Sequence, residues 1–211
     1  LGTQEDWTKI IADGSSGNVA LQYTAADRIL TVTGTYFKAL TISAPGVNVV
    51  LTGTTGPAVK GDLTITDSAS VAVTSSAAGV PAVTGSTDIT SDGAVSITGA
   101  DRAVGGENLT VNAGGDVTIT GGTTSQPTVN DATVRCGGEF ELRNPAGGLV
   151  LCDKTSDGKS GNLHYYNTGA TELVFRASSM GATCDVFQPG DSTVFGTFGN
   201  PSWITAKHEQ D

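Results

Sequence analysis

The stretch that decides the fold is AVKGDLTITDSASVAVTSSAAGVPAVTG, residues 58–85. It holds three short apolar–polar–apolar triplets: LTI at 63–65, VAV at 71–73 and PAV at 81–83. Alternation with a period of two is typical of a strand with one buried face, and the intervening Gly, Asp and Ser residues are typical of turns. The stretch therefore predicts three short strands joined by short connections.

The same three triplets recur along the chain at a nearly constant interval. The three series begin at residues 40, 63, 87, 109 and 132, at 49, 71, 95, 117 and 140, and at 57, 81, 102, 127 and 149. Three series sharing one period predict an all-β solenoid, a three-sided parallel β-helix with about 23 residues per rung. A β-sandwich gives no reason for three series in phase.

The pattern predicts a single β-helix domain over residues 1–211. Within it we expect an N-terminal cap and first partial rung at 1–28, rungs at 29–185, and a C-terminal cap and tail at 186–211. Residues 19–21 and 30–32 are expected in the first, imperfect rung. One further repeat places residues 163–165 in the VAV series and 172–174 in the PAV series.

The two ends of the solenoid are expected to carry bulky caps. No Phe, Tyr or Trp lies between Phe37 and Phe140, which suits a narrow interior. Trp7, Tyr23, Tyr36 and Phe37 gather at one end and are expected to cover it. Residues 6–11, DWTKII, predict a short N-terminal capping helix with Asp6 as its N-cap.

Composition excludes several classes of function. With 21 acidic and 11 basic residues the formal net charge is −10, so we expect no nucleic-acid partner. No run of apolar residues is long enough to cross a bilayer, so we expect no membrane insertion, and the first residues lack the features of an uncleaved export signal.

Cys136, Cys152 and Cys184 form no CxxC motif, and at least two of them are expected to be buried small hydrophobes. We expect no metal and no cofactor, because no zinc or nucleotide motif is present.

The rungs resemble those of a known group of proteins. AVKGDLTIT at 58–66, VAVT at 71–74 and PAVTG at 81–85, with VGGENLTV at 104–111 and VTITG at 117–121, carry the resemblance. They are similar to secreted bacterial right-handed parallel β-helix proteins, often described as carbohydrate-binding domain-containing or adhesin-like. The resemblance covers about residues 40–151. It implies a secreted or cell-surface bacterial protein whose partner is an extracellular glycan or a host or cell-surface protein, and it supplies no catalytic residues.

One stretch of outward positions collects groups that could contact a ligand. The expected outward residues are mostly Thr and Ser, but Glu141, Arg143, His164 and Tyr166 bring together acid, base, imidazole and phenol. If residues 163–165 continue the VAV series, Glu141 lies one rung from His164, and Arg143 one rung from Tyr166. These four residues are the predicted ligand-binding site. The alternative is a set of exposed cross-rung pairs without a function.

The sequence predicts a non-enzymatic extracellular interaction module, surface- or adhesin-like, with carbohydrate as the candidate ligand and no catalytic residues. The alternative is a polysaccharide lyase or glycoside hydrolase with its chemistry near Glu141, Arg143 and His164. Against the enzyme stands the scarcity of basic residues in the rungs, since only Lys60 and Arg102 are basic between residues 39 and 134. A structural stalk is a further alternative. Interruptions of the expected threonine columns argue against an ice-binding face.

Overall fold

The computed structural model describes residues 19–151 and 163–168, and the backbone of strands at 172–177, 185–187, 194–197 and 204–209. These residues form strands and no helix, which confirms the all-β prediction. No helix in this part of the chain is long and apolar enough to cross a membrane. The capping helix predicted for residues 6–11 lies outside the described residues.

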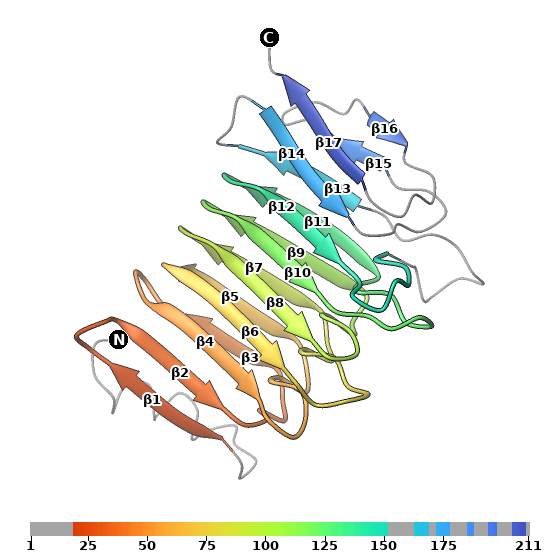
Figure 1. The fold of residues 1–211 in the computed structure, drawn as a ribbon. Coiled ribbons are helices and arrows are strands. Elements are labelled where there is room, and N and C mark those ends of the chain that lie inside the picture. The colour runs from red at the N-terminus through yellow and green to blue at the C-terminus, as the bar shows by residue number, and fades with distance from the viewer. Residues whose placement is uncertain are drawn as a thin grey trace.

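Most strands belong to two sheets whose members alternate along the chain and stack along one axis, from β1 at one end to β17 at the other (Figure 1). Sheet 1 comprises, in spatial order, β1 (Ala20–Thr24), β2 (Ile29–Thr33), β4 (Asn48–Gly53), β6 (Ser70–Ser75), β8 (Val95–Gly99), β10 (Val117–Thr120), β12 (Phe140–Arg143), β14 (Glu172–Ala177) and β17 (Ile204–Glu209). Sheet 2 comprises β3 (Leu40–Ser43), β5 (Leu63–Ser68), β7 (Thr87–Ser91), β9 (Asn108–Ala113), β11 (Asp131–Cys136) and β13 (Leu163–Asn167).

The strand register confirms the predicted parallel β-helix. Neighbouring strands are parallel from β2 to β14 in sheet 1 and from β3 to β13 in sheet 2. Ile65 of β5 pairs with Ile42 and Ile89, its equivalents one rung away on either side. Such columns of like residues bury a continuous core of Val, Ile, Leu and Ala along the axis.

The third side of the solenoid is narrower than the PAV series predicted. It consists of single-residue parallel bridges that link Tyr36, Val59, Val83 and Val104 in turn, and Val129 to Leu151. The period-two alternation expected for this series is wrong, because the middle residues, such as Ala82, are buried beside the last ones. Two consecutive side chains point inward because the chain turns a corner there instead of running as an extended strand.

Antiparallel strands flank the parallel stack of sheet 1. β1 pairs antiparallel with β2, so residues 20–24 form a hairpin strand and not part of a rung. β17 pairs antiparallel with β14, and β15 (Asp185–Phe187) pairs antiparallel with β16 (Val194–Thr197) in a separate sheet. Residues 172–174, predicted for the third side, belong to β14 of sheet 1.

Glycine permits the close stacking of rungs at the corner between the third side and sheet 2. A Cβ atom on Gly61 would lie 2.6 Å from the amide nitrogen of Ala39 and 2.7 Å from the carbonyl carbon of Lys38, one rung away. Such distances are shorter than any van der Waals contact, so a side chain there would push the rungs apart. This corner therefore holds residues 38–39 and 60–61 close together.

Candidate functional site

The structure divides the predicted ligand-binding residues between two sheets. Glu141 and Arg143 lie on β12 in sheet 1, whereas His164 and Tyr166 lie on β13 in sheet 2. His164 pairs in register with Thr133 of β11. The expectation that His164 lies one rung from Glu141, and Tyr166 one rung from Arg143, is therefore wrong.

A longer connection explains this difference. In sheet 2, Leu109 pairs with Ala132, and Ala132 pairs with Leu163. More residues therefore separate Ala132 from Leu163 than separate Leu109 from Ala132. The additional residues fall between Leu151 and Leu163, after the third side and before sheet 2. Leu163, which follows Phe140 of sheet 1 by one ordinary repeat, therefore lies on a strand of sheet 2.

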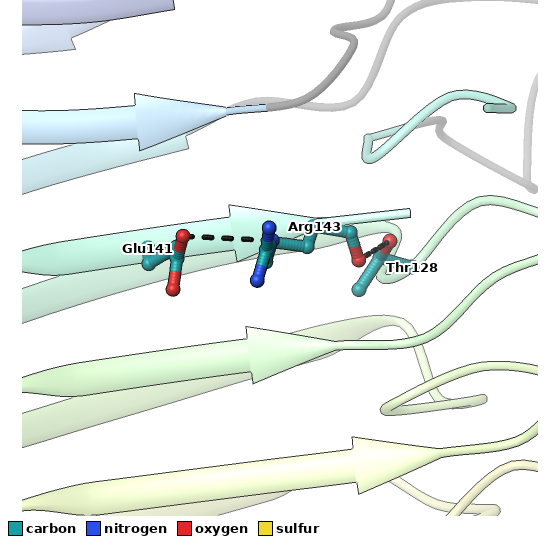
Figure 2. A network of polar contacts seen from close by, with 3 residues as sticks. All are labelled: Thr128, Glu141 and Arg143. Carbon is teal, nitrogen blue, oxygen red and sulfur yellow. Dashed lines mark hydrogen bonds and ion pairs between the residues drawn. The ribbon is translucent and has the colours of Figure 1, made fainter. Parts of the chain in front are cut away.

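Glu141 and Arg143 form a surface ion pair, shown in Figure 2. Glu141 Oε1 lies 3.5 Å from Arg143 Nε, and the Arg143 side chain is about half exposed. The Thr128 hydroxyl donates to the Arg143 carbonyl oxygen at 2.8 Å and also lies 2.6 Å from the carbonyl oxygen of Gly121. Exposed ion pairs are worth about 0–1 kcal/mol, because water screens both charges. The contact stabilises the end of β12 only slightly.

His164 and Tyr166 take part in a polar surface on sheet 2. The Arg135 guanidinium carbon lies 4.0 Å from the centroid of the Tyr166 ring, in a cation–π contact. His164 lines a hollow of about 250 Å³ with Asn108, Leu109, Thr110, Asp131, Ala132 and Thr133. A second hollow of about 220 Å³, farther toward β5, is lined in part by Asp62 and Asp88. This surface of sheet 2 therefore carries carboxylates.

Neither sheet presents a metal-binding cluster in the part of the chain that the structure describes, where no group of three or more His, Cys, Asp or Glu residues could hold an ion. Of the two outward columns of sheet 1, the one that contains Val50 and Ala72 is interrupted as expected, whereas the other consists of threonines alone from β2 to β10. Its members, in register, are Thr33, Thr52, Thr74, Thr98 and Thr120. The column gives this sheet an uncharged surface over five rungs.

A larger groove, of about 540 Å³, lies where the chain leaves sheet 1 in three successive rungs. Its lining residues are Gly34, Thr35, Phe37, Thr54, Thr55, Gly56, Pro57, Lys60, Val80 and Thr84. The three connections that supply them span residues 34–39, 54–62 and 76–86, so the first is the shortest. A short connection extends less far from the sheet than its neighbours, which accounts for the recess beside it.

Phe37, Lys60 and Thr84 occupy the same position in three consecutive rungs of this groove. Each directly follows a residue of the bridged column Tyr36, Val59 and Val83. Phe37 is 40% exposed although the adjacent Tyr36 is only 5% exposed. The Nζ atom of Lys60 lies 5.6 Å from the centroid of the Phe37 ring. Register therefore places an ammonium group over an exposed aromatic ring, a contact worth about 0.5–1 kcal/mol at the surface.

Backbone hydrogen bonds between rungs hold these residues in place. The Tyr36 amide donates to the Ala58 carbonyl at 2.9 Å, the Lys60 amide to the Tyr36 carbonyl at 2.6 Å, and the Thr84 amide to the Val59 carbonyl at 3.0 Å. The groove is built on the ordered third side of the solenoid.

Sequence reasoning missed this groove because it expected Phe37 to cover the end of the solenoid together with Tyr36. The available signal is that Phe37 precedes Lys60 by one repeat, the same interval that separates the LTI triplets at 40 and 63. A second signal becomes clear only with the structure. Arg102 is 2% exposed, with Nη2 2.6 Å from Asn130 Oδ1, so Lys60 is the one exposed basic side chain between residues 39 and 134, all of which are described.

No protein-family model, curated protein or solved structure matches this chain. The resemblance of its rungs to secreted bacterial β-helix proteins therefore stays a prediction.

Proposed function

We propose that this chain is a non-enzymatic extracellular interaction module that binds carbohydrate in the groove beside Phe37 and Lys60. The observation that carries the proposal is an exposed aromatic ring in an open groove that also presents threonine hydroxyls and an ammonium group. One face of a sugar ring is a patch of C–H groups that packs on an aromatic side chain, while its hydroxyls need donors and acceptors. The groove supplies both kinds of contact.

The scaffold favours such binding because the groove is formed before the ligand arrives. The inter-rung hydrogen bonds at Tyr36, Lys60 and Thr84 fix the backbone of three lining segments. A ligand then loses less free energy in ordering its site than it would on a flexible loop. A glycan longer than one residue can extend from the groove along neighbouring rungs.

The similarity of the rungs to secreted bacterial β-helix proteins supports a location outside the cell or at the bacterial cell surface. It also supports an extracellular glycan as the partner, with a host or cell-surface protein as the alternative. The enzyme alternative loses its main support, because Glu141 and Arg143 lie on a different sheet from His164.

A glycan array probed with the wild-type chain and Phe37→Ala tests the proposal. We expect the wild type to bind a subset of glycans, and Phe37→Ala to lose about tenfold in affinity for them, since an aromatic contact is worth about 0.5–1.5 kcal/mol beyond the area it buries. Phe37→Tyr keeps the ring and is expected to bind like the wild type. Thermal unfolding of each variant verifies that it is folded.

Leu149→Ala is the matched control, because Leu149 is the other exposed large hydrophobic residue of the described chain, at 36% exposure, and does not line the groove. An array without binding, or equal binding by Phe37→Ala and the wild type, would contradict the proposal. Assays for new reducing ends or unsaturated products on the bound polysaccharides are expected to stay negative, and turnover would favour the enzyme.

A further inference from the structure

We infer that the groove is selective for a sugar that carries a carboxylate, and that Lys60 is the residue that selects it. The inference rests on the proposed function, since it names the ligand class of the same groove. It can fail while the groove still binds neutral sugars.

The first argument is the distribution of charge. The chain has a formal net charge of −10, yet none of the described residues that line the groove is acidic. Lys60 is the one exposed basic side chain between residues 39 and 134, and it lies in the groove. Lys38, also exposed, directly follows Phe37 in the chain. The groove is therefore a positively charged site on a negatively charged molecule, which concentrates anionic ligands there.

The second argument is that the ammonium group of Lys60 is available to a ligand. Among the described residues no carboxylate forms an ion pair with Lys60, and its side-chain contact is with the ring of Phe37. An anion at this site gains a charge-assisted hydrogen bond without breaking an existing ion pair. Aromatic ring and cation then contact the same ligand from adjacent rungs.

The third argument is the contrast with the other surfaces. The hollows on sheet 2 contain Asp62, Asp88 and Asp131, which would repel a carboxylate. The threonine column on sheet 1 carries no charge to attract one. Sheet 2 also carries a cation over an aromatic ring, Arg135 over Tyr166, but on the surface that holds these aspartates. Because no described carboxylate lines the groove, the groove is where an acidic sugar is expected to bind.

A carboxylate suits the groove better than a phosphate ester, which carries about −1.5 to −2 charges at pH 7, more than a single ammonium group offsets. A single ammonium with neighbouring hydroxyls, from Thr35, Thr54, Thr55 and Thr84, matches one carboxylate on a ring that also carries hydroxyls.

Isothermal titration with defined oligosaccharides tests the inference on the full chain. The acidic probes are tetramers of galacturonate and of mannuronate, the neutral probes are tetramers of galactose and mannose in the same linkages, and a sulfated galactan tetramer is the third arm. We expect the wild type to bind at least one uronate tetramer about tenfold more tightly than its neutral counterpart. Lys60→Gln should weaken uronate binding about tenfold more than neutral binding and so remove this preference, while Lys60→Arg should retain it.

Arg135→Gln is the control for net charge, because Arg135 is an exposed cation that also contacts an aromatic ring but lies on sheet 2. It is expected to leave every affinity unchanged. The preference should also weaken as salt rises, since an exposed ion pair is screened.

The outcomes separate the two proposals. Equal binding of acidic and neutral tetramers, unchanged in Lys60→Gln, would overturn the selectivity and leave the carbohydrate site standing. Tighter binding of the sulfated tetramer than of either uronate would overturn the choice of carboxylate. Loss of all binding in folded Lys60→Gln would show that Lys60 does not act through ligand charge. No binding of any tetramer by the wild type, together with an empty array, would overturn the proposed function itself.

Discussion

Cys136 is a residue whose chemistry is set by its place in the stack. It lies at the end of β11, fully buried, and its thiol donates to the Gly138 carbonyl oxygen at 3.3 Å and toward the Tyr165 hydroxyl at 3.7 Å. Burial raises the pKa of the thiol from 9.0 to about 11, and the nearby charge of Asp116 adds to the increase. Cys136 is a buried free thiol, as expected for a small hydrophobe, and the other two cysteines lie outside the described residues.

The free energy of unfolding is therefore expected to fall as the pH rises from 9 to 11. In this range the unfolded thiol has lost its proton while the folded thiol keeps it, so higher pH favours the unfolded state. A shift from 9.0 to about 11 corresponds to at most about 2.7 kcal/mol. Urea titrations at pH 8 to 11 measure the effect, with Cys136→Ala as the comparison. Parallel pH profiles for the wild type and Cys136→Ala would contradict it.

At the scale of elements, the connections between strands decide where side chains meet. Asn144, buried directly after β12, links two connections. Its Nδ2 lies within hydrogen-bond distance of the carbonyl oxygens of Thr123, Gln126 and Leu149, at 3.0, 3.3 and 2.8 Å, and its Oδ1 accepts from the Ala146 amide at 3.1 Å. One side chain thus satisfies backbone groups of the loops that follow β10 and β12.

Asn144→Ala is expected to lower the free energy of unfolding by about 2–3 kcal/mol, because three carbonyl groups lose the donor that the buried Asn144 side chain supplies. Asn112→Ala, an exposed position on β9, is the matched control and should change it by less than about 0.5 kcal/mol. Chemical denaturation measures both changes, and the dependence of the free energy of unfolding on denaturant concentration is expected to be the same in each variant. If Asn144→Ala lowered the free energy of unfolding no more than Asn112→Ala does, the hydrogen bonds of Asn144 would not stabilise the loops.

The strands could be predicted from the sequence, whereas the candidate site could not. Inward Val, Ile and Leu recur because each rung buries the same two positions per strand, so the register of Ile42, Ile65 and Ile89 can be read from spacing. A connection has no such pattern, and the longer one before Leu163 moved His164 to the other sheet without changing any triplet. Phe37 points outward beside buried Tyr36 because the chain turns there, and alternation does not describe a turn.

At the scale of the whole molecule, stability is expected to vary along the axis. Central strands have hydrogen-bonded neighbours on both sides, and their inward residues, such as Ile65, Val73, Ile97 and Ile119, are completely buried. β1 has one neighbour, and none of its residues is fully buried. In a repeat protein each rung is stabilised by contacts with its neighbours, so rungs inside the stack open least often.

Hydrogen exchange followed by mass spectrometry is expected to show the slowest amides in peptides from β5 to β10 and faster exchange in β1. The comparison is made within one sample, so the peptides control for each other. Equal protection along the chain would mean that the solenoid opens only as one unit. Slowest exchange in β1 would contradict the expected gradient.

Because the register between β8 and β10 is constant, the length of the stack can be changed without altering the groove. Val95 pairs with Val117, so residues 95–116 form one complete repeat. A second copy inserted after residue 116 would lengthen the stack by one strand spacing, about 4.8 Å. It would leave every residue that lines the groove untouched, because all of them precede β7. Each inserted repeat would therefore increase the distance between the groove and β12 by the same amount.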